Sequence, residues 1–283
     1  MSELRVEALT HIYSAGTPFQ KTAIENISLT IPSGQFVGLL GHTGSGKSTF
    51  IQHLNALLAP SSGTVYVDGE DINKDKKSRR AVKNKVGLVF QYPEYQLFEE
   101  TVFADIAFGP KNMGLGKDEI EQRVREAAGF VGVDEELFER SPLELSGGQK
   151  RRIAIAGVIA MRPGILILDE PTAGLDPAGC RQIMDNICRY REESGATVII
   201  VSHNMDDAAR LTQRLIVFNH GSIAMDGTPE QVFSQPEKLV EIGLSVPQST
   251  ALAMELRKQG LPLQGAIYTH GQLMAALKEV GAC

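Results

Sequence analysis

An apolar run passes into a glycine-rich loop at residues 36–48, which read Phe36-Val37-Gly38-Leu39-Leu40-Gly41-His42-Thr43-Gly44-Ser45-Gly46-Lys47-Ser48. The apolar run is typical of a buried parallel strand. Beyond the loop, helical spacing predicts an amphipathic helix that buries Phe50, Ile51, Leu54, Leu57 and Leu58. The loop itself matches the phosphate-binding pattern G-x-x-x-x-G-K-[ST] between a strand and a helix, as that pattern requires. This stretch therefore predicts an α/β fold that binds a nucleotide.

The residue types in this loop explain how it would hold phosphates. Glycines let successive backbone N–H groups turn toward phosphate oxygens, and the following helix presents the positive end of its dipole. Lys47 can reach the β- and γ-phosphates, Ser48 offers a hydroxyl to Mg²⁺, and Thr49 can bond the α-phosphate. The predicted ATP-binding residues of the loop are Gly41, His42, Thr43, Gly44, Ser45, Gly46, Lys47, Ser48 and Thr49.

A second apolar run ends in two acids. Residues Ile165-Leu166-Ile167-Leu168 predict a buried strand, and Asp169 and Glu170 follow at its carboxyl end. Open α/β sheets bind ligands at that edge. Alone, such a pair is often only a strand that ends in surface acids. Beside a phosphate-binding loop, it favours Asp169 as a Mg²⁺ ligand and Glu170 as the general base for an attacking water.

Strand and helix patterns alternate along most of the chain. Further strand patterns occur at 27–31, 65–67, 86–90 and 198–201, and a helical pattern fills about 95–160. This alternation predicts an α/β core with a parallel sheet, interrupted by a helical insertion. After residue 226 the strand patterns stop. We expect one domain over 1–226, with a helical subdomain at about 95–160, and a small C-terminal extension over 227–283.

The composition excludes several classes of protein. The 283 residues carry a net charge of −6, which argues against nucleic-acid binding driven by overall charge. No apolar stretch approaches the roughly 20 residues of a membrane span, and the N-terminus lacks the features of a secretory signal. Three cysteines without a CxxC spacing, Cys180, Cys188 and Cys283, suggest free thiols in a reducing compartment. We therefore expect a soluble intracellular protein.

A basic run at 74–85 contains seven lysines and arginines and one acid. A solvated face of a helix or loop explains such a run. Contact with anionic lipid headgroups or with an acidic partner is the alternative, and the sequence leaves both open.

Five further features resemble those of ATP-binding cassette (ABC) ATPases, across residues 3 to about 228. Leu145-Ser146-Gly147-Gly148-Gln149 resembles the family signature, and Ala173-Gly174-Leu175-Asp176 resembles the D-loop, in which Ser-Ala-Leu-Asp is commoner. Gln91 is similar to the Q-loop glutamine that touches Mg²⁺ and the attacking water, and His203 to the switch histidine that contacts the γ-phosphate. Tyr13 resembles the aromatic residue that stacks on adenine, with Phe19 as the alternative.

This resemblance implies a P-loop ABC nucleotide-binding domain, with a mixed sheet core and a helical subdomain, that hydrolyses ATP with Mg²⁺. The implied Mg²⁺ contacts are Ser48, Gln91 and Asp169, and the implied catalytic residues are Glu170, His203 and Gln91. In the family, the signature of one subunit binds the γ-phosphate that the other subunit holds. That role suits Ser146, Gly147, Gly148 and Gln149 at the start of a helix, and Asp176 completes the implied ATP-binding set. Two functional sites therefore require a dimer.

Three classes of protein use such a cassette. DNA-repair and chromosome-organising ATPases carry very long coiled coils, and translation-associated ATPases typically carry two cassettes, whereas this chain has neither. Transporter motors remain. Residues 91–110, 227–233 and 241–247 closely resemble the ATPases of energy-coupling factor transporters, the vitamin and metal importers, and more specifically the second of their two paralogous subunits. A conventional ABC importer with a soluble binding protein is the alternative.

The transporter resemblance implies a second ATPase subunit, a membrane transducer and a membrane solute-binding subunit as partners, at the cytoplasmic face of the cell membrane. The transducer is expected in a groove near the helix after Gln91. Candidate transmission residues are Pro93, Tyr95, Leu97 and Phe98, unless they only pack the helical subdomain. A packed dimer contact is expected in the tail, because Leu244, Val246, Leu252, Met254, Leu256, Leu261 and Leu263 are too apolar to stay exposed. The solute, and whether two copies or two paralogues pair, stay open.

Overall fold

The computed structural model describes residues 2–281 and centres on a six-stranded sheet with the order β10-β9-β3-β8-β7-β6. Its strands are β3 (Phe36–Leu40), β6 (Val86–Val89), β7 (Ile165–Asp169), β8 (Thr197–Val201), β9 (Arg214–Asn219) and β10 (Ser222–Gly227). All neighbours pair in parallel except β9 and β10, which are antiparallel. The expected α/β fold with a mixed sheet is therefore confirmed.

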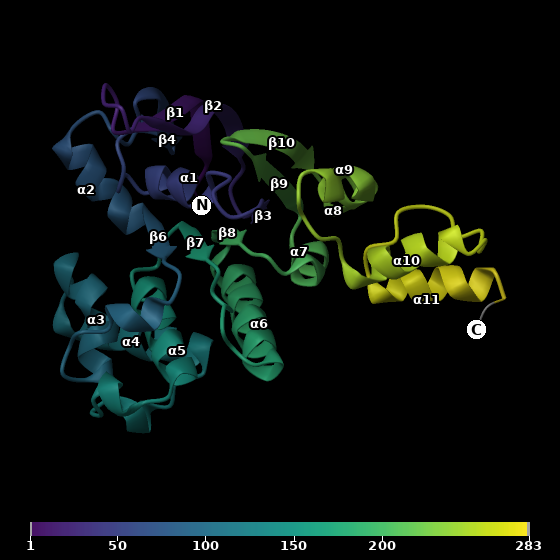
Figure 1. Ribbon diagram of the computed structural model, residues 1–283. Coiled ribbons are helices and arrows are strands. Elements are labelled where there is room, and N and C mark those ends of the chain that lie inside the picture. Colours follow the sequence, from purple (N-terminus) through teal and green to yellow (C-terminus); the bar gives the residue numbers. More distant parts are fainter. Residues whose placement is uncertain (1, 282–283) are drawn as a thin grey trace.

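A second, antiparallel sheet with the order β2-β1-β4-β5 lies on one side of the central sheet (Figure 1). It consists of β1 (Leu4–Tyr13), β2 (Lys21–Ile31), β4 (Ser62–Val67) and β5 (Glu70–Asp71), and the nearby helices are α1 (Lys47–Leu54) and α2 (Lys76–Lys85). Phe50 and Ile51 of α1 share one buried apolar cluster with residues of both sheets. This packing fixes the glycine-rich loop between β3 and α1.

The helical insertion forms a separate lobe on the other side of the central sheet (Figure 1). It contains α3 (Val102–Asn112), α4 (Lys117–Val131) and α5 (Gly147–Ile159), with short 3₁₀ turns at Pro93–Gln96, Glu135–Leu137 and Pro142–Glu144. The lobe and the sheet share a buried cluster that includes Ile153 of α5 and Leu166 and Leu168 of β7.

The remaining helices follow β7, β8 and β10. They are α6 (Pro177–Ser194), α7 (Met205–Leu211), α8 (Pro229–Phe233), α9 (Pro236–Glu241), α10 (Gln248–Lys258) and α11 (His270–Glu279). Helices α10 and α11 lie side by side and project away from the two sheets (Figure 1). Their small core consists of Ala253, Leu263, Ile267 and Leu273.

One expectation about apolar residues is wrong, and another stays a prediction. Helix α1 ends at Leu54 rather than continuing to Leu58, because Ala56 adopts a left-handed backbone with φ of 55°. In the tail, Leu244 and Leu263 are buried within this chain, so much of the apolar surface behind the expected dimer contact is already covered. A contact through the tail stays a prediction, supported by Leu252, which is 48% exposed.

The remaining sequence expectations concern the surface. Across residues 2–281, no helix combines the length and the apolar character that a membrane crossing needs. Cys180 and Cys188 are free thiols, as expected, while Cys283 lies outside the described residues. The basic run forms α2, whose one buried residue is Val82, so most of its charges face solvent.

Candidate nucleotide-binding and catalytic site

A cavity of about 370 Å³ opens at the carboxyl ends of the central strands. Residues from the glycine-rich loop, from the ends of three strands and from the antiparallel sheet line it: Tyr13, Lys21, Ala23, Thr43, Gly44, Gly46, Lys47, Ser48, Thr49, Gln91, Glu170 and His203. Most of these are residues that the sequence selects, from separate motifs. Lys21 and Ala23 on β2 are additional, and no motif in the sequence marks them.

The glycine-rich loop owes its shape to positions that only glycine fits. A Cβ on Gly41 would lie 2.5 Å from Ser45 Oγ and 2.6 Å from the Phe218 carbonyl oxygen, and Gly46 has φ of 109°. Gly41 and Ser45 are buried behind the cavity rather than lining it, and the Ser45 hydroxyl is buried without a hydrogen-bond partner. His42 also lies behind the loop, with Nε2 3.2 Å from Asn219 Oδ1.

Lys47 supplies a positive charge inside the loop. Its Nζ donates hydrogen bonds to the carbonyl oxygens of Gly41, at 2.6 Å, and His42, at 3.1 Å. Burial lowers the pKa of Lys47, while the charges of Glu170 and Asp169 oppose that shift. The ammonium is therefore short of anionic partners in its immediate surroundings, as suits a group that contacts phosphates.

Glu170 is held between the ends of two neighbouring strands. Gln91, after β6, donates a hydrogen bond from Nε2 to Glu170 Oε2 at 2.8 Å, and His203, after β8, lies with Nε2 2.9 Å from Oε1. Since a carboxylate only accepts, the His203 Nε2 carries the proton in this contact. Glu170 itself has φ of 50°, a left-handed conformation that turns the chain sharply after β7. The three predicted catalytic residues thus form one hydrogen-bonded group.

Asp169 precedes this group and is 8% exposed. Burial and then the charge of Glu170 raise the pKa of Asp169, and a hydrogen bond from the Ser48 side chain opposes the rise. Among residues 2–281, no group of three or more histidine, cysteine or acidic side chains is arranged to hold a metal. The predicted donors are the Ser48 hydroxyl, the Asp169 carboxylate and the Gln91 side-chain amide oxygen, which fits Mg²⁺ bound together with substrate phosphates rather than in an all-protein cage.

The antiparallel sheet contributes the aromatic edge of the cavity. Tyr13 at the end of β1 is 40% exposed, and its hydroxyl lies 3.2 Å from Thr49 Oγ1. Phe19, the alternative stacking residue, is 85% exposed and does not line the cavity. The geometry favours Tyr13 over Phe19.

The signature residues lie apart from the cavity of their own chain. Ser146 begins α5 with a capping box, in which Ser146 Oγ accepts from the Gln149 backbone N–H while Gln149 Oε1 accepts from the Ser146 N–H. Ser146 and Gly147 are exposed. Asp176 caps α6, accepting from the Gly179 N–H at 2.7 Å. None of these residues lines the cavity, so one chain does not bring all the predicted ATP contacts together.

Arg151 joins three of the motifs, which the sequence alone does not reveal. Its guanidinium is 2% exposed and forms a two-point ion pair with Glu94, at 3.0 and 2.6 Å. It also donates to the carbonyl oxygens of Pro171 and Ala173 and lies over the Tyr92 ring. The segment after Gln91, the signature helix and the approach to the D-loop are therefore connected through one buried side chain.

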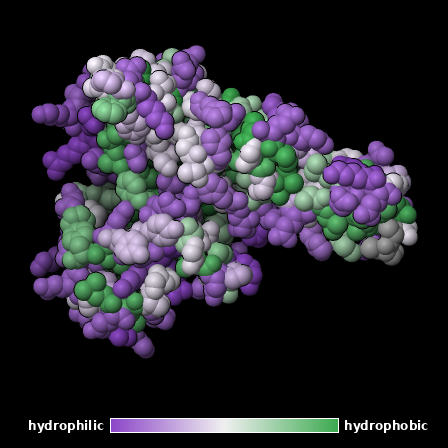
Figure 2. Space-filling view, in the orientation of Figure 1, coloured by the Kyte–Doolittle hydropathy of each residue, from purple (hydrophilic) through white to green (hydrophobic). Residues whose placement is uncertain are grey.

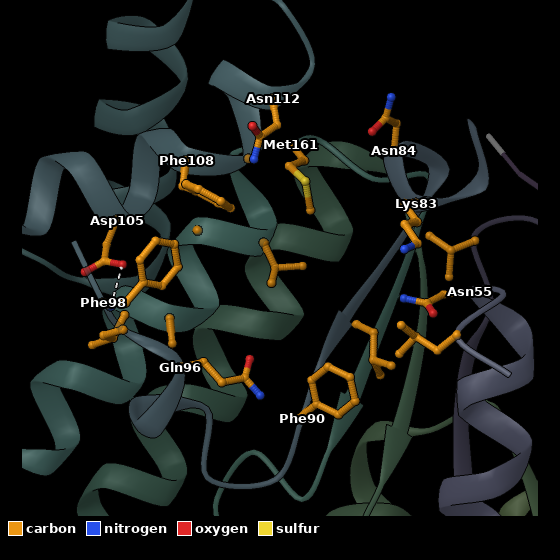
Figure 3. Close-up of a pocket in the computed structure, with 18 of the residues that line it drawn as sticks. Asn55, Lys83, Asn84, Phe90, Gln96, Phe98, Asp105, Phe108, Asn112 and Met161 are labelled. Carbon is orange, nitrogen blue, oxygen red and sulfur yellow. Dashed lines mark hydrogen bonds between the residues drawn. The ribbon is translucent and has the colours of Figure 1, made fainter. Parts of the chain in front are cut away.

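A larger cavity, of about 580 Å³, lies between the helical lobe and the sheets, where the surface is hollowed (Figure 2). Phe90, Phe98, Phe108 and Met161 line it (Figure 3). Of the candidate transmission residues, Leu97 and Phe98 line this groove, Pro93 is buried, and Tyr95 is 84% exposed outside it.

One buried acid also faces this groove. Asp105 accepts a hydrogen bond from the Phe98 N–H through Oδ1, while its Oδ2 is buried without a partner (Figure 3). Burial raises the pKa of Asp105. Across the groove, Arg80 and Lys83 of the basic helix α2 line the opposite wall.

Comparison with known proteins identifies relatives over nearly the whole chain. A family model described as ABC transporter matches residues 24–173. The energy-coupling factor transporter ATP-binding protein EcfA2 of Caldanaerobacter subterraneus subsp. tengcongensis is 55% identical over 266 residues, covering 94% of this chain and 93% of that protein. The protein of the same name from Clostridium perfringens is 53% identical over 278 residues, covering 98% of each.

Solved structures show the same fold. The cbiO1 protein of Clostridium perfringens, part of the ABC transporter complex cbiONQ, aligns with a TM-score of 0.75 at 39% identity, covering 89% of this chain and 98% of that one. A dimeric post-hydrolysis state of the ATP-binding cassette MJ0796, bound to ADP and Pi, aligns with a TM-score of 0.72 at 29% identity, covering 80% of this chain and 98% of that one.

Proposed function

Since this chain belongs to the ATP-binding proteins of energy-coupling factor transporters, within the ABC transporter family, we propose that it hydrolyses ATP to power uptake of a vitamin or a transition metal ion. The observation that carries the proposal is Glu170, which is held by Gln91 and His203 beside a phosphate-binding loop.

In this proposal each group at the cavity has one task. Backbone N–H groups of residues 41–48 and the Lys47 ammonium bind the phosphates, and Tyr13 stacks on adenine. Glu170 accepts the proton of the attacking water, Gln91 orients that water, and His203 contacts the γ-phosphate. Ser48, Gln91 and Asp169 would hold Mg²⁺, which neutralises charge on the phosphates when it is bound. Water is thereby activated only where the γ-phosphate lies.

Hydrolysis in this scheme requires two ATPase subunits. Ser146–Gln149 and Asp176 lie outside the cavity of their own chain, so they are available to a nucleotide held by a second subunit. The N–H groups at a helix start lack acceptors within the helix backbone, so they are suited to the γ-phosphate. ATP then joins the subunits, and loss of the γ-phosphate releases them. The similar MJ0796 cassette is dimeric in its solved structure, which supports this arrangement.

The groove between the helical lobe and the sheets is our proposed contact for the membrane transducer. It is lined by Leu97 and Phe98, only a few residues after Gln91, so a helix seated there lies close to the catalytic group along the chain. The subunit would thus lie peripherally at the cytoplasmic face of the membrane. Helix α2, which lines one wall of the groove, would take part in the same contact.

The catalytic assignment is tested with Glu170→Gln and Lys47→Ala. Glu170→Gln is expected to keep ATP affinity while lowering phosphate release by about 10²–10⁴-fold, because it removes only the base. Lys47→Ala is expected to weaken ATP binding itself. The control is Glu139→Gln, an exposed acid away from the cavity. Equal loss of binding and turnover in Glu170→Gln would contradict the role of the base.

The transport assignment is tested by detergent extraction of the tagged chain from its native membrane, followed by mass spectrometry of the proteins that accompany it. A second cassette subunit with a transducer and a small membrane solute-binding protein supports the proposal. Recovery with ribosomes or DNA, and without membrane proteins, overturns it.

A further inference from the structure

Two buried histidines lie beneath the aromatic edge of the nucleotide cavity. His53, near the end of α1, is fully buried, and His11 on β1 is 9% exposed. Their nearest ring nitrogens, His53 Nε2 and His11 Nδ1, are 3.2 Å apart, and the ring centroids are 4.7 Å apart. Buried polar rings need defined partners, so this pair has a definite hydrogen-bonding arrangement.

The backbone acceptors determine which nitrogens carry protons. His53 Nδ1 lies 2.7 Å from the Thr49 carbonyl oxygen, so Nδ1 carries the proton and neutral His53 presents a lone pair at Nε2. His11 Nδ1 faces that lone pair and also lies 3.2 Å from the Ala59 carbonyl oxygen. Because both of these neighbours only accept, His11 Nδ1–H is the donor. Two neutral rings therefore satisfy each other and tie β1 to α1.

The pair continues directly to the nucleotide cavity. The His11 ring meets Tyr13 edge-on, with centroids 4.5 Å apart, and the Tyr13 hydroxyl reaches Thr49 Oγ1 in the first turns of α1. Strand β1 pairs irregularly with β2 between Leu9 and Ile12, and such irregularities re-aim side chains. The chain of contacts from Thr49 through His53 and His11 to Tyr13 thus closes on Thr49 again.

We propose that His11 and His53 are positioning residues, which as a neutral imidazole pair hold the Tyr13 ring in the orientation that receives adenine. The inference rests on the proposed contact of Tyr13 with adenine. It extends that proposal by separating two parts of nucleotide affinity. The pair affects the contact with the base, while the phosphates are held by residues 41–48 independently of it.

The pH dependence of ATP affinity distinguishes a positioning role of the histidine pair from a purely structural one. Burial, and then the neighbouring His11, lower the pKa of His53 from its ordinary value of 6.5. A proton on His53 Nε2 would face the His11 N–H and remove the acceptor between the rings. Within residues 2–281, Tyr13 is the other titratable side chain in contact with the pair, and His11 is the one titratable group that acts on the charge of His53. Adenine affinity is therefore expected to fall below pH 6.5.

The experiment compares two ligands, ATP and inorganic tripolyphosphate, by calorimetry on the full chain. The variants are His11→Leu and Tyr13→Leu, with His270→Gln as control, because His270 is an exposed imidazole on α11. His11→Leu is expected to weaken ATP about two- to tenfold, the range for loss of one aromatic contact, and to leave tripolyphosphate unchanged. As the pH is lowered from 7.5 through the folded pKa of His53, which burial lowers, the advantage of wild type over His11→Leu for ATP should disappear. Comparing proteins at each pH cancels protonation of the ligand.

Each outcome separates this inference from the proposal beneath it. If Tyr13→Leu weakens ATP and His11→Leu does not, Tyr13 binds adenine and the positioning role is wrong. An unchanged ATP affinity in Tyr13→Leu overturns both the adenine contact and the positioning role. If His11→Leu weakens tripolyphosphate as much as ATP, or if its deficit for ATP is the same at every pH at which both proteins stay folded, the pair is merely structural and the inference is overturned.

Discussion

Replacing Arg151 by Met should lower the free energy of unfolding by more than the loss of an exposed ion pair does. The guanidinium makes two hydrogen bonds to Glu94 and further hydrogen bonds to two backbone carbonyls. The Glu94 side chain is only 14% exposed. Removing one partner of a buried ion pair typically costs about 3–5 kcal/mol. Since water can still reach part of Glu94, we expect about 3 kcal/mol for Arg151→Met.

The assay is urea unfolding of the nucleotide-free chain at pH 7, with the midpoint and the m-value both recorded. Arg125→Met is the matched control. Arg125 also pairs with two glutamates, but its side chain is 45% exposed, so its replacement should cost much less stability than that of Arg151. In the double variant Arg151→Met/Glu94→Leu, no unpaired carboxylate remains, so the cost should be well below the sum of the single variants.

Two results would refute this reasoning. One is a loss for Arg151→Met no larger than that for Arg125→Met. The other is strict additivity in the double variant, which would mean that the two side chains do not interact energetically. Because Arg151 touches the segment after Gln91 and the approach to the D-loop, the same variant should also lower ATP hydrolysis.

Three further predictions follow from single features of the structure. Asp169→Asn should raise the urea midpoint at pH 7, because burial and Glu170 raise the folded pKa of Asp169 and the stability of the wild type therefore falls as the pH rises through that folded pKa. The variant should lose this advantage near pH 4, and a midpoint below that of the wild type at pH 7 contradicts the prediction. Replacing Leu97 and Phe98 by Ser should reduce transport without changing ATP hydrolysis by the isolated subunits, and the control is Tyr95→Ser, at an exposed residue outside the groove. Normal transport by the double variant would show that the groove does not transmit ATP hydrolysis to the membrane subunits. Gly46→Ala should weaken ATP binding more than Gly44→Ala: both positions have positive φ, 109° and 80°, but only a Cβ on Gly46 would meet the Ala23 carbonyl oxygen, at 2.8 Å. Calorimetry that finds equal affinities for the two variants would show that this contact is not limiting.

Local motifs predicted where the glycine-rich loop and the hydrogen-bonded group around Glu170 lie, because both depend on short stretches placed at strand ends. Gln91, Glu170 and His203 lie far apart in sequence, but β6, β7 and β8 are adjacent parallel strands, so their carboxyl ends meet. The family resemblance supplied the roles of these residues, whereas the alternation of strand and helix supplied only the sheet.

Three other features were not predicted, and the reason differs for each. Arg151 stands in a run of basic residues that looks solvated, yet its neighbour Glu94 lies 57 residues away. Strands β9 and β10 form a hairpin that was not among the predicted strands, although Leu215-Ile216-Val217-Phe218 is a clear apolar run. The end of α1 was misplaced because apolar periodicity continues past Leu54, while the left-handed backbone at Ala56 does not allow a helix.

The capping box at Ser146 has a consequence for how long two subunits stay together. The Ser146 hydroxyl already donates to Gln149 Oε1 at 2.9 Å, and the Gln149 N–H already has an acceptor in Ser146 Oγ. If the signature binds the γ-phosphate held by a second subunit, as we propose, a phosphate oxygen at these two groups replaces bonds that the helix start makes to itself, and the two groups add only the difference between old and new bonds to adhesion. Such an exchange gives a contact that forms with specific geometry and little surplus free energy. Two subunits joined by such a contact would separate readily once the γ-phosphate is gone, as repeated cycles of ATP hydrolysis require.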